Sequence, residues 1–251
     1  MISFDLTGKR AIVTGGAQGL SKKMAEGLME AGVTVVIIDI SPTLGETVAE
    51  FEKVGYRCWG VKANLALQKD RERAFEESLH ILGGLDILVN GAGIQRRHKS
   101  EEFPLEDWNL VLDINLTAVF SLCQMAAQEF IRQGGGKIIN IASMISFFGG
   151  YTIPAYAASK GGVAQLTKAF SNEWAAYKIN INALAPGYMD TEMNSALLAD
   201  EVRNSEITAR IPAHRWGSGE DMKGPLIFLA SDASSYLSGA IIPVDGGYLS
   251  R

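Results

Sequence analysis

The sequence predicts an α/β fold: a doubly wound, parallel sheet of seven strands with helices on both faces. Short β-branched runs alternate with helical patterns along the whole chain, as expected of strand–helix–strand units. Several of these runs are apolar at consecutive positions, which is typical of strands covered by helices on both sides. The expected strands are residues 11–14, 33–38, 57–61, 87–90, 137–141, 179–185 and 240–244.

The first predicted helix, residues 20–31, connects the first two strands. Leu20, Met24, Leu28 and Ala31 share one face of it, and the following glycine suits the turn that ends a helix. No repeat, low-complexity tract or Pro/Ser-rich linker divides the 251 residues, so we expect a single domain, residues 1–251.

One long stretch, residues 187–216, follows a strand end and carries no strand signal of its own. Loops in this position of α/β proteins often cover a ligand, so we expect this region to cover the substrate. A surface excursion of two helices without a role fits the same pattern. Arg215 and Trp216 are expected to brace the region rather than to touch substrate.

The composition excludes several classes of protein. With 47% hydrophobic and 20% charged residues, the chain is neither disordered nor fibrous in character. The net charge of −5, without a basic stripe, gives no reason to bind nucleic acid. We find no signal-peptide pattern and no apolar run near the roughly 18 residues of a membrane span, and so expect a cytoplasmic protein without a membrane partner.

Cys58 and Cys123 are the two cysteines of the chain. They lie far apart and form no C-x-x-C pair, so the sequence predicts neither a disulfide framework nor a metal site. We expect both to be buried free thiols in a reducing compartment.

A glycine-rich segment, residues 14–21 (TGGAQGLS), follows the first strand and opens the first helix. Glycine lets the backbone turn sharply beside a pyrophosphate, whose charge is then met by the amides and the positive end of the helix dipole. The position indicates a dinucleotide-binding loop and hence a Rossmann-type domain. Its candidate contacts are Gly15, Gln18, Gly19 and Leu20.

Asp39 ends the second strand, 24 residues after Gly15. A carboxylate there accepts hydrogen bonds from both hydroxyls of an adenosine ribose and repels a 2′-phosphate, so we expect NAD(H) as the cofactor, with NADPH less favoured. A helix-cap or turn role for Asp39 is the alternative, although the adjacent Ser41-Pro42 suits that role better.

Ser143, Tyr156 and Lys160 form the candidate catalytic group. Tyr156 and Lys160 are four residues apart in a helical pattern, so they share a face, and a neighbouring cation lowers the pKa of a phenol. Ser143 follows a strand and can donate to the substrate oxygen while Tyr156 transfers the proton. A surface tyrosine beside a lysine has the same spacing, so the order of all the motifs carries the inference.

That order, from the glycine loop through Asp39 and the strand-end serine to Tyr156 and Lys160, resembles the short-chain dehydrogenase/reductase family over nearly the whole length. The resemblance implies a nicotinamide-dependent oxidoreductase acting on a secondary alcohol or ketone. It also implies a fourth catalytic residue, Asn115, which anchors a water linked to the lysine. The alternative for Asn115 is a polar residue in a helix interior.

The resemblance implies further dinucleotide contacts. Pro186-Gly187 matches the turn that passes the nicotinamide, Thr191 matches a hydroxyl beside it, and Asn64 stands where an Asp commonly meets the adenine. The implied set, in addition to Asp39 and the glycine loop, is Asn64, Leu65, Asn90, Ala92, Gly93, Tyr156, Lys160, Pro186, Gly187, Met189 and Thr191.

Besides Asn64, two further positions depart from the family pattern. Ser21 replaces the third glycine of the loop, and Gly91 replaces the second Asn of an N-N-A-G segment. A serine adds a CH₂OH group where helix and sheet pack closely, so we expect it to weaken dinucleotide binding modestly. Ser21→Gly is then expected to tighten NADH binding or leave it unchanged.

Residues 138–147, 182–189 and 210–217 are similar to the sugar-acid dehydrogenases of this family, which implies a substrate such as 2-keto-3-deoxygluconate. Its carboxylate needs a cation, and Arg96 and Arg97 stand at the expected mouth of the site, although either fits a solvated loop charge equally well. The candidate substrate-binding residues are Gln95, Arg96, Arg97, Ser143, Met144, Tyr156 and Tyr188.

Two other functions fit the motifs: a reductase of 3-oxoacyl thioesters or other small ketones, and a non-catalytic dinucleotide-binding redox sensor. Ser143, Tyr156 and Lys160 together argue against the sensor. The resemblance also implies a homotetramer in which helices around residues 103–132 and 155–177 pair across two-fold axes. The apolar positions of those helices suit internal packing equally well.

Overall fold

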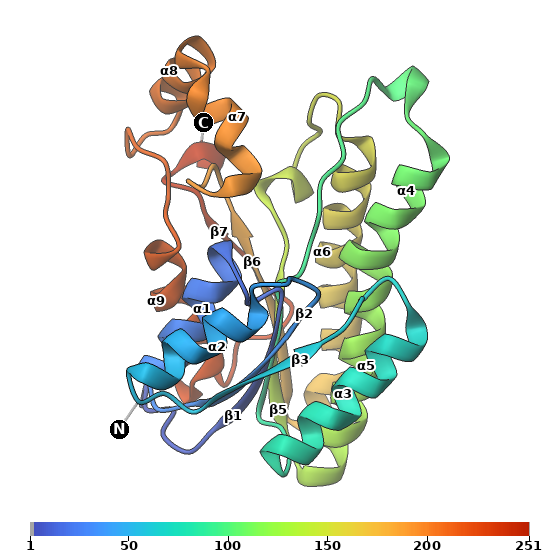
Figure 1. Ribbon diagram of the computed structural model, residues 1–251, viewed down its shortest axis with the longest axis vertical. Coiled ribbons are helices and arrows are strands. Elements are labelled where there is room, and N and C mark those ends of the chain that lie inside the picture. The colour runs from blue at the N-terminus through green and yellow to red at the C-terminus, as the bar shows by residue number, and fades with distance from the viewer. Residues whose placement is uncertain (1–2, 251) are drawn as a thin grey trace.

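All seven strands of the computed structural model, which describes residues 3–250, lie in one parallel sheet (Figure 1). The strand order is β3-β2-β1-β4-β5-β6-β7. The predicted strands are confirmed, with every end within one residue of its expected place. The strands are β1 (Arg10–Thr14), β2 (Thr34–Asp39), β3 (Cys58–Lys62), β4 (Ile87–Asn90), β5 (Gly136–Ile141), β6 (Ile179–Pro186) and β7 (Ile241–Val244).

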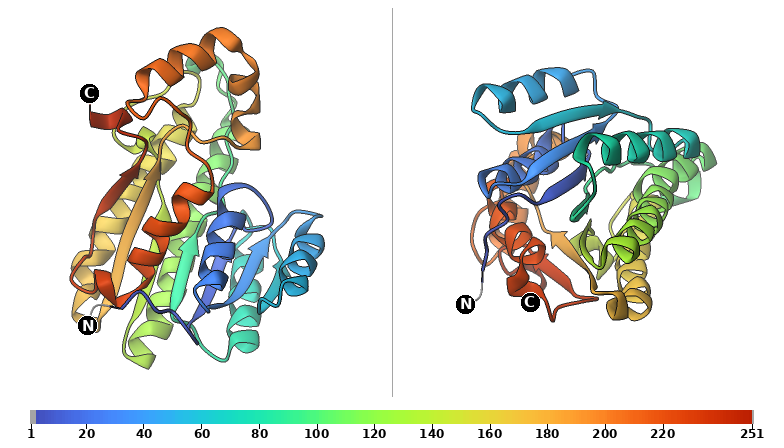
Figure 2. Two further views of the ribbon diagram at one scale, coloured as in Figure 1. Left: turned by 90° about the vertical axis from the view of Figure 1, so that its left-hand side faces the viewer. Right: turned by 90° about the horizontal axis from the view of Figure 1, so that it is seen from below.

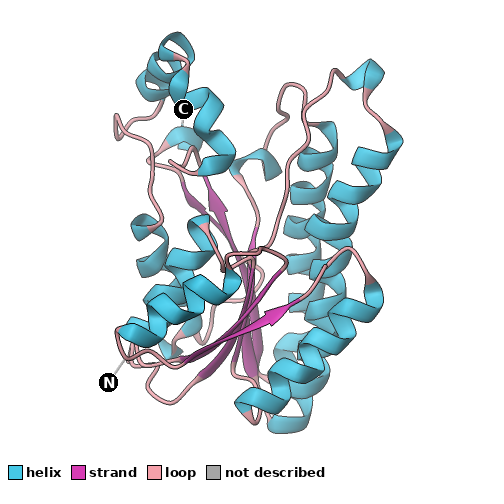
Figure 3. Ribbon diagram, in the orientation of Figure 1, coloured by secondary structure: helices cyan, strands magenta, loops and turns pink. Residues whose placement is uncertain are grey.

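Helices cover both faces of the sheet, as Figures 2 and 3 show. One face carries α1 (Gly19–Glu30), α2 (Leu44–Lys53) and α9 (Glu220–Ala230). The other carries α3 (Gln68–Leu82), α5 (Ala118–Gln133) and α6 (Pro154–Trp174), with α4 (Leu105–Leu112) directly before α5. Two further helices, α7 (Ser195–Ala199) and α8 (Glu201–Arg210), stand above the carboxyl edge of the sheet (Figure 1).

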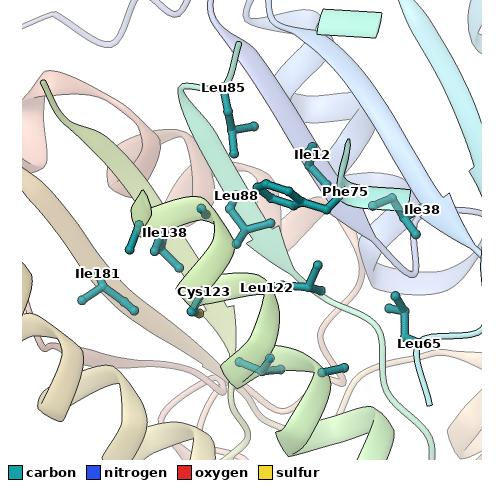
Figure 4. Close-up of a cluster of buried hydrophobic side chains, with 14 of the residues drawn as sticks. Ile12, Ile38, Leu65, Phe75, Leu85, Leu88, Leu122, Cys123, Ile138 and Ile181 are labelled. Atoms are coloured by element: carbon teal, nitrogen blue, oxygen red, sulfur yellow. The ribbon is translucent and has the colours of Figure 1, made fainter. Parts of the chain in front are cut away.

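The hydrophobic core consists of two large clusters, one on each face of the sheet. Alternate residues of a strand point to opposite faces, so Ile12 enters one cluster while its neighbours Ala11 and Val13 enter the other. Figure 4 shows Ile12 beside Leu88, in the cluster beneath α3 and α5. This packing explains why the strands are apolar at consecutive positions.

The chain reverses its direction of progress across the sheet between β1 and β4. From β1 the next strands, β2 and β3, extend to one side, whereas β4 and the later strands extend to the other. The connections that leave the carboxyl ends of β1 and β4 therefore diverge to opposite faces and leave a crevice, which is where doubly wound sheets bind their ligands.

One helix corrects an expectation from the sequence. Within the described residues, α4, a π-helical turn (η2, Asp113–Thr117) and α5 form one continuous helix, Leu105–Gln133, of 29 residues. By length and composition alone it could cross a membrane, so the expectation that no stretch approaches this limit was wrong. In the structure 44% of its apolar window is buried, and α5 packs on the sheet beside α3 and α6. Its apolar side chains form part of the core.

Both cysteines are buried free thiols. Burial raises the pKa of Cys58 and of Cys123 to about 12, so both side chains remain protonated near neutral pH. They act as small apolar core residues.

Candidate active site

Tyr156 and Lys160 lie one helical turn apart near the start of α6. The helix begins at Pro154, whose fixed backbone angle suits a first helical turn. Lys160 is 4% exposed, and its Nζ lies 5.8 Å from the centre of the Tyr156 ring. The spacing in the sequence therefore predicted this pairing correctly.

The Lys160 ammonium is held at the end of the sheet. Its Nζ donates a hydrogen bond of 2.6 Å to the carbonyl oxygen of Ile141, the last residue of β5. Burial disfavours the charged form and lowers the pKa of Lys160 to about 8. The amine is thus mostly cationic at pH 7 but titrates far below the range of an exposed lysine.

The pKa of Tyr156 departs from the expectation. Burial raises the pKa of the phenol above its ordinary value, and a hydrogen bond with the Ser143 side chain counteracts only part of that rise. The sequence predicted a lowered pKa because of the nearby lysine. That prediction was wrong, because desolvation of the buried phenol outweighs the hydrogen bond with Ser143.

Ser143 caps a short 3-10 turn that follows β5 (η3, Met144–Ser146). Its Oγ accepts a hydrogen bond from the Ile145 amide at 3.2 Å. Ser146 Oγ in turn donates to the carbonyl oxygen of Lys160 at 2.7 Å. These bonds fix the serine turn against α6, so the Ser143 hydroxyl lies next to the Tyr156 phenol.

Asn115 is fully buried within the π-helical turn η2. Its Oδ1 accepts from the Ile94 amide at 2.8 Å, and its Nδ2 donates to the Ile94 carbonyl at 2.9 Å and to Ser159 Oγ at 3.2 Å. The side chain therefore joins the long helix, the segment after β4 and α6. Such π turns occur frequently at functional sites.

A cleft of about 420 Å³ lies between the glycine loop, the end of β2 and the segment after β4. The predicted residues that line it are Gly15, Gln18, Leu20, Asp39, Asn64, Leu65, Ala92 and Gly93. The sequence did not assign the other lining residues, which are Ser21, Ile38, Ile40, Ser41, Ala63, Gly91, Ile94 and Ile114. The crevice expected from the strand order is therefore present.

The glycine loop and Asp39 fix each other's position. Gly15 has a φ of +73°, and a Cβ there would lie 2.7 Å from the Cα of Ala92, so glycine is required. One Asp39 oxygen accepts from the Ala17 amide and the other from the Ser41 amide, both at 2.9 Å. Each carboxylate oxygen keeps a free lone pair for a ligand.

The cleft extends to the catalytic group. A Cβ on Gly93, which lines the cleft, would lie 3.6 Å from Lys160 Nζ and 3.3 Å from Asn115 Oδ1. The segment after β4 therefore lies against the glycine loop at Ala92 and against Lys160 at Gly93. All the candidate groups lie at the same edge of the sheet.

Several predicted dinucleotide contacts lie outside this cleft. The Asn90 side chain is buried and donates to Asn140 Oδ1 at 2.8 Å and to Cys123 Sγ at 3.2 Å, which places it in the core under α5. Gly19 and Thr191 line an adjoining hollow that contains Lys22 and Lys23. Pro186, Gly187 and Met189 lie at the carboxyl end of β6 and just beyond it.

The candidate substrate cations have different surroundings. Arg96 Nε lies 3.4 Å from Asp107 Oδ1. The other oxygen of the same carboxylate, Asp107 Oδ2, lies 2.6 Å from His98 Nε2. Arg97 is exposed and forms no ion pair with any residue in the described part of the chain. The His98 amide donates to the Thr152 carbonyl, so this segment lies beside the loop that leads into α6.

The region above the sheet edge is braced by aromatic side chains. Trp216 Nε1 donates to Asn204 Oδ1 at 2.9 Å and to Thr208 Oγ1 at 3.2 Å, both on α8. Tyr188 packs edge-on against Trp216 and Tyr248, with ring centres 5.2 and 5.4 Å apart. Met144 belongs to the same apolar cluster, and Gln95 is half-buried in the segment before Arg96.

Thr14 is a structural residue of the site that the sequence interpretation missed. Its Oγ1 accepts hydrogen bonds from the amides of Gly91 and Ala92, both at 3.1 Å. It is the last residue of β1, and β4 pairs directly with β1. A hydroxyl at a strand end beside a glycine loop is the signal that could have identified it.

Residues 9–202 match the short chain dehydrogenase family. The 2-dehydro-3-deoxy-D-gluconate 5-dehydrogenase of Escherichia coli (strain K12) is 48% identical over 251 residues, covering 99% of this chain and 98% of that protein. The protein of the same name from Dickeya dadantii (strain 3937) is 46% identical over 250 residues, with the same coverage of both chains. A crystal structure of a gluconate 5-dehydrogenase from Burkholderia cenocepacia J2315, in complex with NADP and tartrate, has a TM-score of 0.95 at 40% identity, covering 99% of this chain and 98% of that chain. The chain therefore belongs to the short-chain dehydrogenase family.

Proposed function

We propose that the protein is an NAD(H)-dependent oxidoreductase that interconverts a secondary alcohol and a ketone on a deoxy-sugar acid such as 2-keto-3-deoxygluconate. The observation that carries the proposal is the position of Tyr156 and Lys160 at the end of the dinucleotide cleft, next to Ser143. The substrate class rests on the relatives named 2-dehydro-3-deoxy-D-gluconate 5-dehydrogenase.

The cleft fits a dinucleotide. Gly15 allows the glycine loop to pass directly against the backbone of Ala92, and the loop opens the 12-residue helix α1, whose positive end favours a phosphate. We assign the adenosine half to the cleft residues, and the nicotinamide half to Tyr156, Lys160 and the end of β6. When bound, the dinucleotide supplies or accepts the hydride.

The chain's own residues handle the proton. In the reductive direction the Tyr156 hydroxyl donates its proton to the carbonyl oxygen, and in the oxidative direction the phenolate takes the proton from the alcohol. Ser143 Oγ donates a second hydrogen bond to the same oxygen. Lys160 supplies a positive charge beside the phenolate, and Asn115 holds the backbone of Ile94, which follows the Gly93 that lies beside the lysine.

The lining of the cleft favours NAD(H) over NADP(H). Among the described residues that line it, Asp39 is the sole ionisable group, and none is Lys, Arg or His. A 2′-phosphate there would meet a carboxylate without a compensating cation. The Burkholderia relative was crystallised with NADP, so the cofactor preference needs a direct comparison.

We assign the substrate carboxylate to Arg97 or Arg96, and the rest of the substrate pocket to Gln95, Met144 and Tyr188. Within residues 3–250 no carboxylate pairs with Arg97, whereas Arg96 would have to share Asp107 with the substrate. We also propose that residues 187–216 cover the bound substrate, because α7 and α8 stand above the sheet edge that carries the catalytic group (Figure 1).

The decisive experiment measures oxidation of NADH and of NADPH with keto sugar acids, 3-oxoacyl thioesters and simple ketones. The proposal predicts the highest kcat/KM for NADH with a keto sugar acid. A higher value with a thioester would favour the alternative reductase, and dinucleotide binding without turnover of any compound would favour the redox sensor.

Arg97→Ala should raise KM for the sugar acid about tenfold or more, because a charge-assisted hydrogen bond is lost. Lys99→Ala, which removes an exposed cation two residues away, is the matched control.

We propose a homotetramer in the cytoplasm. An apolar groove of about 450 Å³ runs between α5 and α6, and Phe120 within it is 42% exposed. A second copy of the chain would cover this surface. The groove is lined by Leu116, Thr117, Phe120, Gly162, Gln165, Leu166 and Ala169. Two free thiols suit a reducing compartment.

A further inference from the structure

We propose that Ser21 and Gly91 form a matched pair that positions the segment Gly91 to Gly93 along the dinucleotide cleft. The proposal rests on the proposed function and deepens it, because it assigns a role in cofactor binding to two of the positions at which the chain departs from the family pattern. These positions lie 70 residues apart in the chain and are in contact in the structure.

Ser21 lies in the first turn of α1 and is 5% exposed. Its Oγ donates a hydrogen bond of 3.2 Å to the carbonyl oxygen of Gly91. The amides of Gly91 and Ala92 are already held by Thr14 Oγ1. The first peptide units after β4 are therefore fixed from both sides, by Thr14 through their N–H groups and by Ser21 through a carbonyl.

Gly91 is the residue that leaves room for the Ser21 side chain. A Cβ at position 91 would overlap Ser21 Oγ and would lie 2.9 Å from the carbonyl oxygen of Thr14. The serine hydroxyl thus occupies the space into which a side chain at position 91 would project. A serine at 21 is compatible with a glycine at 91, and a smaller residue at 21 would remove the nearest of the two close contacts that a side chain at 91 would make.

The position of this segment affects both ends of the cofactor site. On one side Ala92 Cα lies so close to Gly15 that no Cβ fits between them, and on the other side Gly93 lies beside Lys160 and Asn115. A shift of the Gly91 carbonyl would move the wall shared by the glycine loop and the catalytic lysine. This role reverses the expectation from the sequence: Ser21 is not a defect in the loop, and removing it should weaken NADH binding.

The test is a double-mutant cycle on NADH affinity, measured by fluorescence titration of the enzyme without substrate. Ser21→Gly and Ser21→Ala should each raise the Kd of NADH about threefold, because each loses one neutral hydrogen bond. Gly91→Ala should raise it about tenfold or more through overlap with Ser21. Ser21→Gly/Gly91→Ala should bind at least about threefold more tightly than Gly91→Ala alone, because the overlap with Ser21 is removed and only the close approach to the Thr14 carbonyl remains. Gly224→Ala, at an exposed helical glycine with open space around it, is the matched control and should leave the Kd unchanged.

A double variant that binds NADH no better than Gly91→Ala would overturn the pairing. If Gly91→Ala fails to fold, the serine variants decide: an unchanged Kd overturns the proposal even if the unfolding temperature falls, since a merely structural serine would affect stability alone. Failure of the proposed function has a different signature, in which the wild-type protein turns over no keto sugar acid with NADH or NADPH, whatever the Kd values of the variants.

Discussion

At the scale of single residues, burial determines the ionisation of Lys160. The folded protein removes the ammonium from water and offers it the Ile141 carbonyl, and the resulting pKa of about 8 lies below the 10.5 of an unfolded lysine. The unfolded chain therefore binds more protons than the folded one between pH 8 and 10.5, and stability rises with pH in that window. Below pH 8 the full cost of burying the charge is present.

Lys160→Met should therefore stabilise the protein at pH 7. The pKa shift corresponds to roughly 3 kcal/mol, and loss of the hydrogen bond to Ile141 offsets about 1 kcal/mol of it, so the expected gain is roughly 2 kcal/mol. Urea denaturation from pH 6 to 10.5 should show the gain decreasing above pH 8. Lys168→Met, on the exposed side of the same helix, should show no such pH dependence. A destabilised Met variant at pH 7 would refute this interpretation.

Asp39 is the residue on which the cofactor preference depends. Asp39→Asn keeps the size of the side chain and removes its charge, so the ratio of kcat/KM for NADPH to that for NADH should rise about tenfold or more. The comparison requires both cofactors at a saturating concentration of sugar acid. An unchanged ratio would show that the Asp39 carboxylate accepts hydrogen bonds from the Ala17 and Ser41 amides but does not discriminate between the two cofactors.

Spacing in the sequence predicted that Tyr156 and Lys160 would meet, because a helix fixes which residues share a face. It did not predict the direction of the Tyr156 pKa, because the depth of burial depends on what covers the helix. The resemblance placed Asn90 beside the cofactor, but it did not predict that the Asn90 side chain would donate to Asn140 and Cys123, because those partners come from other elements.

At the scale of elements, α8 is held over the sheet edge through the Trp216 indole. Trp216→Phe keeps an aromatic ring against Tyr188 but removes the indole N–H that donates to Asn204 and Thr208. If α8 covers the substrate, KM for the sugar acid should rise about fivefold or more while the Kd of NADH changes little. Trp59→Phe, on the exposed side of β3, is the matched control. A rise in the NADH Kd with an unchanged KM would place α8 over the cofactor instead.

The strand ends could be predicted to within one residue, because short β-branched runs between helical patterns fit few structures other than buried parallel strands. The π-helical turn at Asn115 could not be predicted. It coincides with hydrogen bonds from Asn115 to Ile94 and Ser159, which come from two other elements and are brought together only by the fold. The overlap of Ser21 with any side chain at position 91 could not be predicted either, because the two positions lie far apart in the sequence and meet only in the folded chain.

At the scale of the whole molecule, the apolar groove between α5 and α6 is the surface on which the proposed tetramer depends. Phe120→Glu places a charge in that groove, so light scattering should show a mass below that of the wild-type assembly, because a carboxylate cannot be buried there unpaired. Val54→Glu alters an exposed apolar residue outside the groove and should leave the mass unchanged. A wild-type monomer would contradict the proposal.

The parallel sheet brings the segments that follow its strands to one edge, and the strand order reverses between β1 and β4. The central claim is that Tyr156 transfers the proton there, beside a separately formed dinucleotide cleft. The most direct test compares Tyr156→Phe with the wild type for kcat and for the Kd of NADH, with Tyr151→Phe, a fully solvated tyrosine of the preceding loop, as control. The account predicts a fall in kcat of about a thousandfold and a Kd within about twofold of the wild type. A Phe variant that retains a tenth or more of the wild-type kcat would contradict it.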